Sequence, residues 1–260
     1  MPIQVRATTH RLDDAAFRRI AFDVMSCVFD IHNEFGRFFD EKIYKRELGR
    51  RFPGAELEVP IEVRFESFCK LYFLDVLVGG GGVFEFKAVE SLTSRHRSQL
   101  LQYLMAADLS HGKLVNMRTE LVQHEFVNTK LQLSDRTGFE VRNHGWQEIG
   151  DKPLLEWFVA FLRDIGTCLD ISMYEDALSH LLGGEERVTH DIEVASGGKV
   201  LGPQKFRLIA PGVALKVTAL PEDSNLFEIH ARRLLEHTRL DAIQWINVAR
   251  KEVSFRTIRR

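Results

Sequence analysis

Two amphipathic helices are predicted at the start of the chain by the spacing of its apolar residues. Residues 15–34 place apolar side chains three or four positions apart, which is the period of one helix face. Asp13 or Asp14 is a suitable N-cap for this helix. Gly36 interrupts the pattern, and residues 39–50 resume it as a second helix.

A strand-rich segment follows these helices. Residues 56–65 alternate between apolar and polar side chains, and residues 70–78 form a more continuously apolar strand. The four glycines at 79–82 predict a turn into a third strand over residues 83–89. Beyond it the pattern predicts a helix over 94–109 and short strands over 113–117 and 121–127. This order of elements is typical of a mixed α/β fold.

The second half of the chain repeats this order in outline. A polar, turn-rich stretch over residues 128–150 suits an exposed hairpin or a domain junction. After it the apolar pattern predicts helices over 153–165 and near 228–238, and strands near 188–195, 206–218, 242–248 and 252–258.

A local sequence similarity accompanies the repeated order. The stretch that begins at Gly166 resembles the one that begins at Gly36, and Tyr174 matches Tyr44 at the same offset of 130 positions (166 − 36 and 174 − 44). Two α/β domains could share an element order by coincidence, and divergent internal duplication is the interpretation that we favour. We therefore expect domains over residues 1–128 and 151–260, joined by 129–150.

Composition excludes several classes of function. The formal net charge is −2, so the chain lacks the overall basic balance of a pure nucleic-acid binder, although an enzyme needs only a local basic path. Cys27, Cys69 and Cys168 lie far apart, which argues against structural zinc and iron–sulfur clusters. No signal-peptide pattern and no membrane-length apolar run occur, and we expect a cytoplasmic protein.

Three charged residues lie on the two strands that the glycine turn joins. Asp75 stands within an apolar strand, where a buried carboxylate is costly unless it is paired or bound to a metal. Glu85 and Lys87 are two positions apart on the next strand and share a face. Asp75 and Glu85 can thus converge on one hard divalent cation such as Mg²⁺. An ordinary cross-strand ion pair is the alternative, but the apolar neighbours of Glu85 suit a central strand better.

Two predicted helices add polar groups to this hairpin. Glu41 could supply a further metal ligand, or it could pair with Lys45 one helical turn later. Gln99 and Tyr103 are four positions apart and share a helix face. Gln99 could hold a water or a phosphate, and Tyr103 could stack or form a hydrogen bond; half-buried packing is the alternative for both.

Basic residues open the helix that carries this pair. Arg95, His96 and Arg97 lie near backbone amides suited to bind phosphate. A solvated charged face is the alternative interpretation. The histidines elsewhere form no HxxxH or HxH pair, which argues against a zinc hydrolase.

In combination these motifs resemble the PD-(D/E)XK nuclease superfamily, and more closely its bacterial GxxExxY group. The Gln-xxx-Tyr element is similar to that of RecB-type nucleases. In the GxxExxY motif a glycine stands three positions before the glutamate. Phe38 occupies that position here, which leaves the local turn geometry open. The resemblance covers about residues 15–127 and rests on Gly36, Glu41, Tyr44, Asp75, Glu85-Phe86-Lys87, Gln99 and Tyr103.

The resemblance implies a restriction-endonuclease-like core, in which a mixed central β-sheet is flanked by helices. It also implies phosphodiester hydrolysis with Mg²⁺ or Mn²⁺. The implied metal ligands are Glu41, Asp75 and Glu85, and Lys87 would be the catalytic lysine. We expect the catalytic residues to be Asp75, Glu85, Lys87, Gln99 and Glu41, and the substrate contacts to be Tyr103, Arg95, Arg97 and Tyr44.

The second half lacks the acidic residues of this motif. Ile171 stands at the position of Glu41, and the segment 207–220, which aligns with the acidic hairpin, contains no acid. Lys216 is the residue that could answer to Lys87. We therefore expect a degenerate, pseudonuclease copy that serves in scaffolding, dimerisation or substrate binding.

Two classes of function stay open at this stage. The first is a metal-dependent nuclease that acts on DNA. A homodimer of such a nuclease would place two active sites on one duplex. The second is a non-catalytic two-lobed scaffold that binds nucleic acid or protein and keeps a vestigial metal site. Hydrolysis of another phosphate ester is a third possibility. The chain has no GxxxxGK[ST] loop, so any ATPase or helicase activity would come from a partner.

Overall fold

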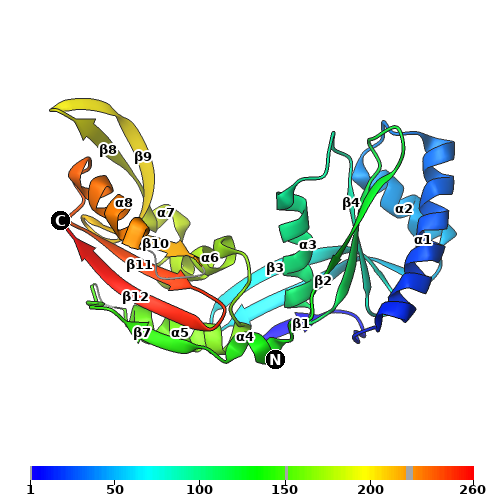
Figure 1. Ribbon diagram of the computed structural model, residues 1–260, viewed down its shortest axis with the longest axis horizontal. Helices are drawn as coiled ribbons and strands as arrows, with labels where there is room; N and C mark the ends of the chain where they lie inside the picture. The colour runs from blue at the N-terminus through cyan, green and yellow to red at the C-terminus, as the bar shows by residue number, and fades with distance from the viewer. Residues whose placement is uncertain (1, 150–151, 221–224) are drawn as a thin grey trace. The chain divides into compact units, whose positions relative to one another are not determined.

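The computed structural model describes residues 2–149, 152–220 and 225–260. The chain divides into two compact units, Met1–Asp135 and Arg136–Arg260. Each unit contains a six-stranded mixed sheet with helices packed on it (Figure 1). The expected fold class, a mixed α/β fold with helix-flanked sheets, is therefore confirmed. None of the described helices is long and apolar enough to cross a membrane.

The first unit contains one sheet in the order β1-β2-β3-β4-β5-β6, in which only β4 and β5 are parallel. Its strands are β1 (Ile3–Val5), β2 (Ala55–Phe65), β3 (Phe68–Val78), β4 (Gly82–Lys87), β5 (His111–Asn116) and β6 (Gln123–Asn128). Its helices are α1 (Asp14–Phe35), α2 (Glu41–Arg51), α3 (Ser94–Ala106) and α4 (Leu133–Thr137).

Helices α1 and α2 cover one face of this sheet, and α3 lies on the other (Figure 1). Asp13 is the N-cap of α1, and its carboxylate accepts a hydrogen bond from the Ala16 N–H at 2.7 Å. The helix buries an apolar stripe that includes Val24, Val28 and Ile31, as its period predicts. This stripe and the apolar side chains of β4 form the core that holds the central strands in place.

The turn between β3 and β4 depends on glycine. Gly79 and Gly80 have φ angles of +57° and +65°, a backbone region that other residues seldom adopt. A Cβ on Gly81 would lie 2.4 Å from the carbonyl oxygen of His10, because the N-terminal segment crosses the turn. Gly82 already belongs to β4, so the turn is one residue shorter than the sequence suggested.

Strands β3 and β4 separate just beyond this hairpin. Their paired register runs from Val78–Gly82 to Val76–Phe84 and then stops. The residues that follow on the two strands are Asp75 and Glu85. Charged side chains can enter the sheet here because the strands no longer fill the space with ladder hydrogen bonds.

The second unit has the sheet order β7-β12-β11-β10-β9-β8. Its strands are β7 (Glu140–Asn143), β8 (Thr189–Ser196), β9 (Lys199–Ala210), β10 (Val213–Thr218), β11 (Ala242–Val248) and β12 (Glu252–Arg259). Its helices are α5 (Leu154–Ile165), α6 (Ile171–Leu181), α7 (Glu185–Val188) and α8 (Asn225–Glu236). The segment predicted as one strand over 206–218 is two strands, which a Pro211-Gly212 turn separates.

Five strands of each unit follow the same order with the same orientations. Strands β2 to β6 are matched by β8 to β12, and among these five matched strands the one parallel pair is β4–β5 in the first unit and β10–β11 in the second. The sixth strand differs, since β1 extends the sheet beside β2 whereas β7 extends it beside β12. Glu41 and Ile171 are the first residues of α2 and α6.

A buried tyrosine closes the loop before α2. The hydroxyl of Tyr44 donates to the carbonyl of Gly36 at 2.7 Å and accepts from the N–H of Phe39 at 3.2 Å. The side chain is fully buried, so these two bonds replace water for three polar groups.

The loop before α6 is closed in the same way. The hydroxyl of Tyr174 donates to Gly166 at 3.0 Å and accepts from the N–H of Leu169 at 2.9 Å. Burial raises the pKa of Tyr174 above its ordinary value, so the hydroxyl stays protonated and able to donate. The two units therefore share a hydrogen-bonding device as well as a strand order.

Replacing Tyr174 by phenylalanine leaves the Leu169 N–H and a buried carbonyl unpaired, and we expect a loss of about 1–3 kcal/mol from the free energy of unfolding of the second unit. Urea denaturation followed by tryptophan fluorescence measures this unit alone, since all three tryptophans lie in it. Tyr44→Phe is the matched control and should leave the fluorescence transition in place. An unchanged midpoint in Tyr174→Phe would contradict the account.

Candidate active site

Asp75 is held by two donors at the point where β3 and β4 separate. Its Oδ1 lies 2.6 Å from the Nζ of Lys45, and its Oδ2 accepts from the Phe86 N–H at 2.9 Å. The carboxylate side chain is 13% exposed. A buried carboxylate is thus satisfied by one backbone amide and one lysine.

Glu85 is the more deeply buried of the two predicted acids, at 2% exposure. Its Oε1 accepts from the Nζ of Lys87 at 2.7 Å, and its buried Oε2 has no hydrogen-bond partner among the described residues. Burial, followed by the negative charge of Asp75, raises its pKa from an ordinary 4.5 to about 7, while Lys87 acts in the opposite direction. A cation at this unpaired oxygen would offset the negative charges of Glu85 and Asp75.

Lys87 and Glu41 complete the polar end of β4. Burial acts to lower the pKa of Lys87, but the charge of Glu85 and its hydrogen bond outweigh burial, so the pKa is raised and the ammonium form is favoured. Glu41 contributes to this effect, and its Oε1 accepts from the Ala88 N–H at 3.0 Å. Glu41 therefore binds the backbone next to Lys87 and forms no ion pair with Lys45.

Gln99 and Tyr103 form the pair that their spacing on α3 predicts. Gln99 Nε2 donates to the hydroxyl of Tyr103 at 2.9 Å. Burial raises the pKa of Tyr103, the hydrogen bond from Gln99 opposes this, and the charges of Glu85 and Asp75 add to the rise. Both side chains are half-buried, and the phenol lies within the electrostatic reach of the acids.

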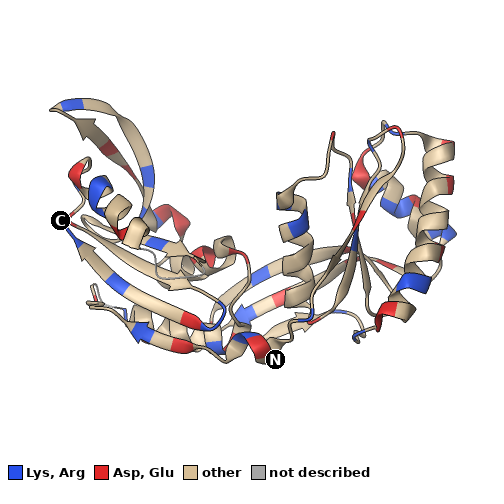
Figure 2. Cartoon of the chain, viewed as in Figure 1, with Lys and Arg blue, Asp and Glu red and all other residues tan. Residues whose placement is uncertain are grey.

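The basic residues at the start of α3 divide into exposed and paired groups. Arg95 is exposed, whereas Arg97 forms a two-pronged ion pair with Glu125 at 2.6 and 2.8 Å. His96 accepts from the Thr93 N–H through Nδ1 at 3.0 Å, and burial and nearby Lys87 lower its pKa. Acidic and basic segments are interspersed over each unit in Figure 2.

Tyr44 lies apart from the surface that a substrate could reach. It was expected to contact substrate, but its side chain is fully buried and its hydroxyl is used within the loop before α2. The expectation for Tyr44 is corrected on this ground: the residue holds Gly36 and Phe39 in place and thereby positions the first turn of α2, which carries Glu41.

Two members of the site were missed by the sequence analysis. Lys45 binds Asp75 and also the Oε1 of Glu58, which lies on β2 opposite Asp75. Lys45 was considered only as a partner of Glu41. Glu58 is one of the polar positions of the alternating strand predicted over 56–65, and its positive φ of 50° leaves no trace in the sequence.

The predicted metal ligands are not gathered into a ready cage. Among the described residues, no three His, Cys, Asp or Glu side chains are grouped so as to hold a metal ion. The negative charge of Asp75 acts on Glu85, whereas the Glu41 carboxylate accepts a hydrogen bond from the Ala88 N–H. An open pocket of about 270 Å³ lies beside Glu41 and Ala88 and is also lined by Asp40, Lys42 and Arg118.

A buried asparagine supports the end of the parallel strand pair in each unit. Asn116 of β5 accepts from the Val89 N–H at 3.1 Å and donates to the Val89 carbonyl at 2.8 Å. Asn247 of β11 makes the same two bonds with Leu220, at 2.8 and 3.1 Å. These bonds fix the structural correspondence between β4 and β10.

This correspondence corrects one sequence-based match. The strand partners of the two asparagines are Lys87 and Thr218, and two residues earlier lie Glu85 and Lys216. Lys216 therefore stands at the position of Glu85, and not at that of Lys87 as expected. Its Nζ lies 5.6 Å from the centre of the Phe206 ring, so a cation–π contact replaces the acid–lysine pair of the first unit.

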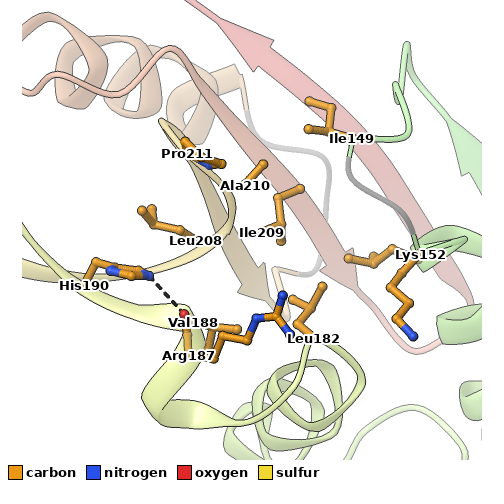
Figure 3. A pocket seen from close by; sticks show the side chains of 11 residues that line it. Ile149, Lys152, Leu182, Arg187, Val188, His190, Leu208, Ile209, Ala210 and Pro211 are labelled. Carbon is orange, nitrogen blue, oxygen red and sulfur yellow. Dashed lines mark hydrogen bonds between the residues drawn. The ribbon is translucent and has the colours of Figure 1, made fainter.

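The second unit has a pocket of its own, of about 570 Å³, which Figure 3 shows. Its polar lining is Lys152, Arg187 and His190, whose Nε2 lies 3.0 Å from the Arg187 carbonyl oxygen. The rest of the described lining is apolar, and none of the described lining residues is a carboxylate.

Comparison with known proteins gives a family match that lies within the first unit. Residues 18–129 match the family model of the PD-(D/E)XK nuclease superfamily. The match spans 112 of the 260 residues and contains the whole Asp75, Glu85 and Lys87 arrangement. Nucleases of this superfamily in general hydrolyse phosphodiester bonds of nucleic acids and typically use divalent metals such as Mg²⁺.

The other comparisons add little. No curated protein matches the chain. One solved structure, titled "Crystal structure of SSO0001", is similar at 17% identity with a TM-score of 0.28, and the match covers 50% of this chain and 71% of that chain. A similarity at this TM-score carries no weight for the fold or the function.

The raised pKa of Glu85 predicts a pH dependence of stability. Because the folded pKa of about 7 exceeds the ordinary 4.5, the folded state binds the proton more tightly, so this contribution is present below 4.5 and lost as the pH rises through 7. From about pH 5 to about pH 8, the free energy of unfolding of the metal-free wild type should fall by about 2 kcal/mol relative to Glu85→Gln. Hydrogen exchange of peptides from the first unit measures this difference, and parallel pH profiles would contradict it.

Proposed function

We propose that the first unit is a divalent-metal-dependent nuclease that hydrolyses phosphodiester bonds in DNA. Within its superfamily we place it with the GxxExxY group. The observation that carries the proposal is the buried, unpartnered Oε2 of Glu85 beside Asp75, with Lys87 on the other oxygen of Glu85. The match of residues 18–129 to a nuclease superfamily supports it.

The two acids fit a hard divalent cation. The charge of Asp75 adds to the cost of ionising Glu85, and an ion between them would remove that cost. Mg²⁺ or Mn²⁺ prefers oxygen ligands and is held in many sites by one or two carboxylates. We assign Asp75 and Glu85 as ligands, with Glu41 able to join once its carboxylate leaves the Ala88 amide. When bound, such an ion supplies Lewis acidity toward a phosphoryl oxygen.

Lys87 is the residue that acts on the reacting group. Its ammonium is held 2.7 Å from Glu85 Oε1, which fixes a positive charge next to the cation site. A buried ammonium in this place offsets negative charge that develops on the phosphoryl group. Gln99 and Tyr103 offer an amide and a phenol from α3 to hold a water or a phosphate oxygen. We assign Arg95 and Arg97 as contacts to backbone phosphates elsewhere along the nucleic-acid strand.

We further propose that the second unit is a divergent pseudonuclease copy of the first, spanning about residues 151–260. The common strand order, the tyrosine that closes the loop before the second helix, and the asparagine at the end of the parallel pair support a common origin. Lys216 and Phe206 stand where the first unit has acids, so this copy has lost its metal ligands. Its use is scaffolding, dimerisation or substrate binding.

Cleavage of DNA in the presence of Mg²⁺ or Mn²⁺ should fall by about a hundredfold or more in Glu85→Gln and in Lys87→Met, since each removes a charge from the reacting centre. Glu62→Gln and Lys113→Met are matched controls, because each changes a buried residue of the same type outside the site. Cleavage assays on labelled DNA and RNA, with and without EDTA, measure the effect. Equal rates in wild type and both site variants would point to the non-catalytic scaffold.

Activity should reside in the first unit alone. Lys216→Met removes the one basic residue that replaces an acid in the second unit, and we expect it to leave the cleavage rate unchanged. The same assay measures this variant beside the wild type. A loss of tenfold or more, with tryptophan fluorescence unchanged, would show that the second copy takes part in the chemistry.

A further inference from the structure

Lys45 places a positive charge on Asp75 from within the protein. Its Nζ lies 2.6 Å from Asp75 Oδ1, and the two side chains are 11% and 13% exposed, so solvent screens the pair little. Burial acts to lower the pKa of Lys45, but the hydrogen bonds that its ammonium donates to Asp75 and Glu58 outweigh burial, and the pKa is raised. A metal ion bound by Asp75 would compete for the oxygen that this ammonium holds.

Glu58 provides the ammonium with a second anchor. It lies opposite Asp75 between the pairs Leu57–Val76 and Val59–Leu74 of strands β2 and β3. Its φ of +50° is strained for a residue with a side chain. Its own side chain is 53% exposed, so burial does not hold it, and the ion pair with Lys45 is its contact within the site.

We propose that Lys45 is a built-in counter-cation of the metal site, which neutralises Asp75 in the metal-free protein and is retained by Glu58 alone when a divalent ion binds. This inference rests on the proposed function, because it concerns the same site. It adds that the affinity for metal depends on a competition between Lys45 and the metal ion for Asp75.

The competition follows from the charges at the site. Without metal, Asp75 and Glu85 repel each other in a buried place, and the ammonium of Lys45 lowers that cost. With metal, an ammonium left beside the ion would repel it. The flexible four-carbon stem of lysine lets the ammonium shift toward Glu58, whose half-exposed carboxylate lies on the solvent side. Lys45 thus acts through Asp75 and does not touch the reacting atoms.

Calorimetric titration of the full chain with MnCl₂ tests this competition. Lys45→Met removes the competitor, and binding should tighten by about tenfold or more. Glu58→Gln removes the second anchor, so Lys45 stays on Asp75 and binding should weaken by about tenfold. In the double variant the Glu58 change should have little further effect, because Glu58 acts through Lys45. Lys113→Met, which changes another buried lysine, should bind as the wild type does.

Four results would overturn the inference. Unchanged or weaker binding in Lys45→Met, with a wild type that binds Mn²⁺, overturns it and leaves the proposed function intact. A further loss on Glu58→Gln in the Lys45→Met background assigns Glu58 as a direct ligand. Unchanged binding in Glu58→Gln, a variant of a half-exposed side chain, overturns it even if Lys45→Met does not fold. Absence of Mn²⁺ binding in wild type and every variant overturns the proposed metal chemistry as well.

Discussion

Two carboxylates buried side by side are the constraint to which the rest of the first unit responds. Asp75 and Glu85 sit where β3 and β4 separate, and burial together with the charge of Asp75 raises the pKa of Glu85. Lys45 and Lys87 each neutralise one of them, and the Phe86 amide satisfies a further oxygen. The remaining oxygen, Oε2 of Glu85, has no hydrogen-bond partner among the described residues.

The second unit shows that the scaffold does not need these charges. It keeps the five-strand order, and it keeps the tyrosine and asparagine hydrogen bonds that hold the loop before the second helix and the end of the parallel pair. In place of two acids it has Lys216 over the ring of Phe206. The hydrogen bonds that the two units share are therefore formed with or without the acids of the first unit.

The sequence predicted the helices and central strands well, because their apolar periods are long and their ends carry caps such as Asp13. It also predicted that Asp75 and Glu85 approach each other, since a glycine turn leaves two strands few alternatives. The three-residue β1 was too short to leave a pattern. Glu58 and Lys45 were missed because a strained backbone angle and a contact across 30 positions have no local signal. The position of Lys216 required the strand register, which a count along the chain cannot supply.

The central claim is that Asp75 and Glu85 bind one divalent ion in the first unit. Anomalous scattering from a crystal of the whole chain soaked in MnCl₂ tests it most directly. The account predicts a manganese peak in contact with both carboxylates, with Lys45 withdrawn from Asp75 toward Glu58. A crystal that shows no peak at these carboxylates, with the Lys45–Asp75 pair intact, would contradict it.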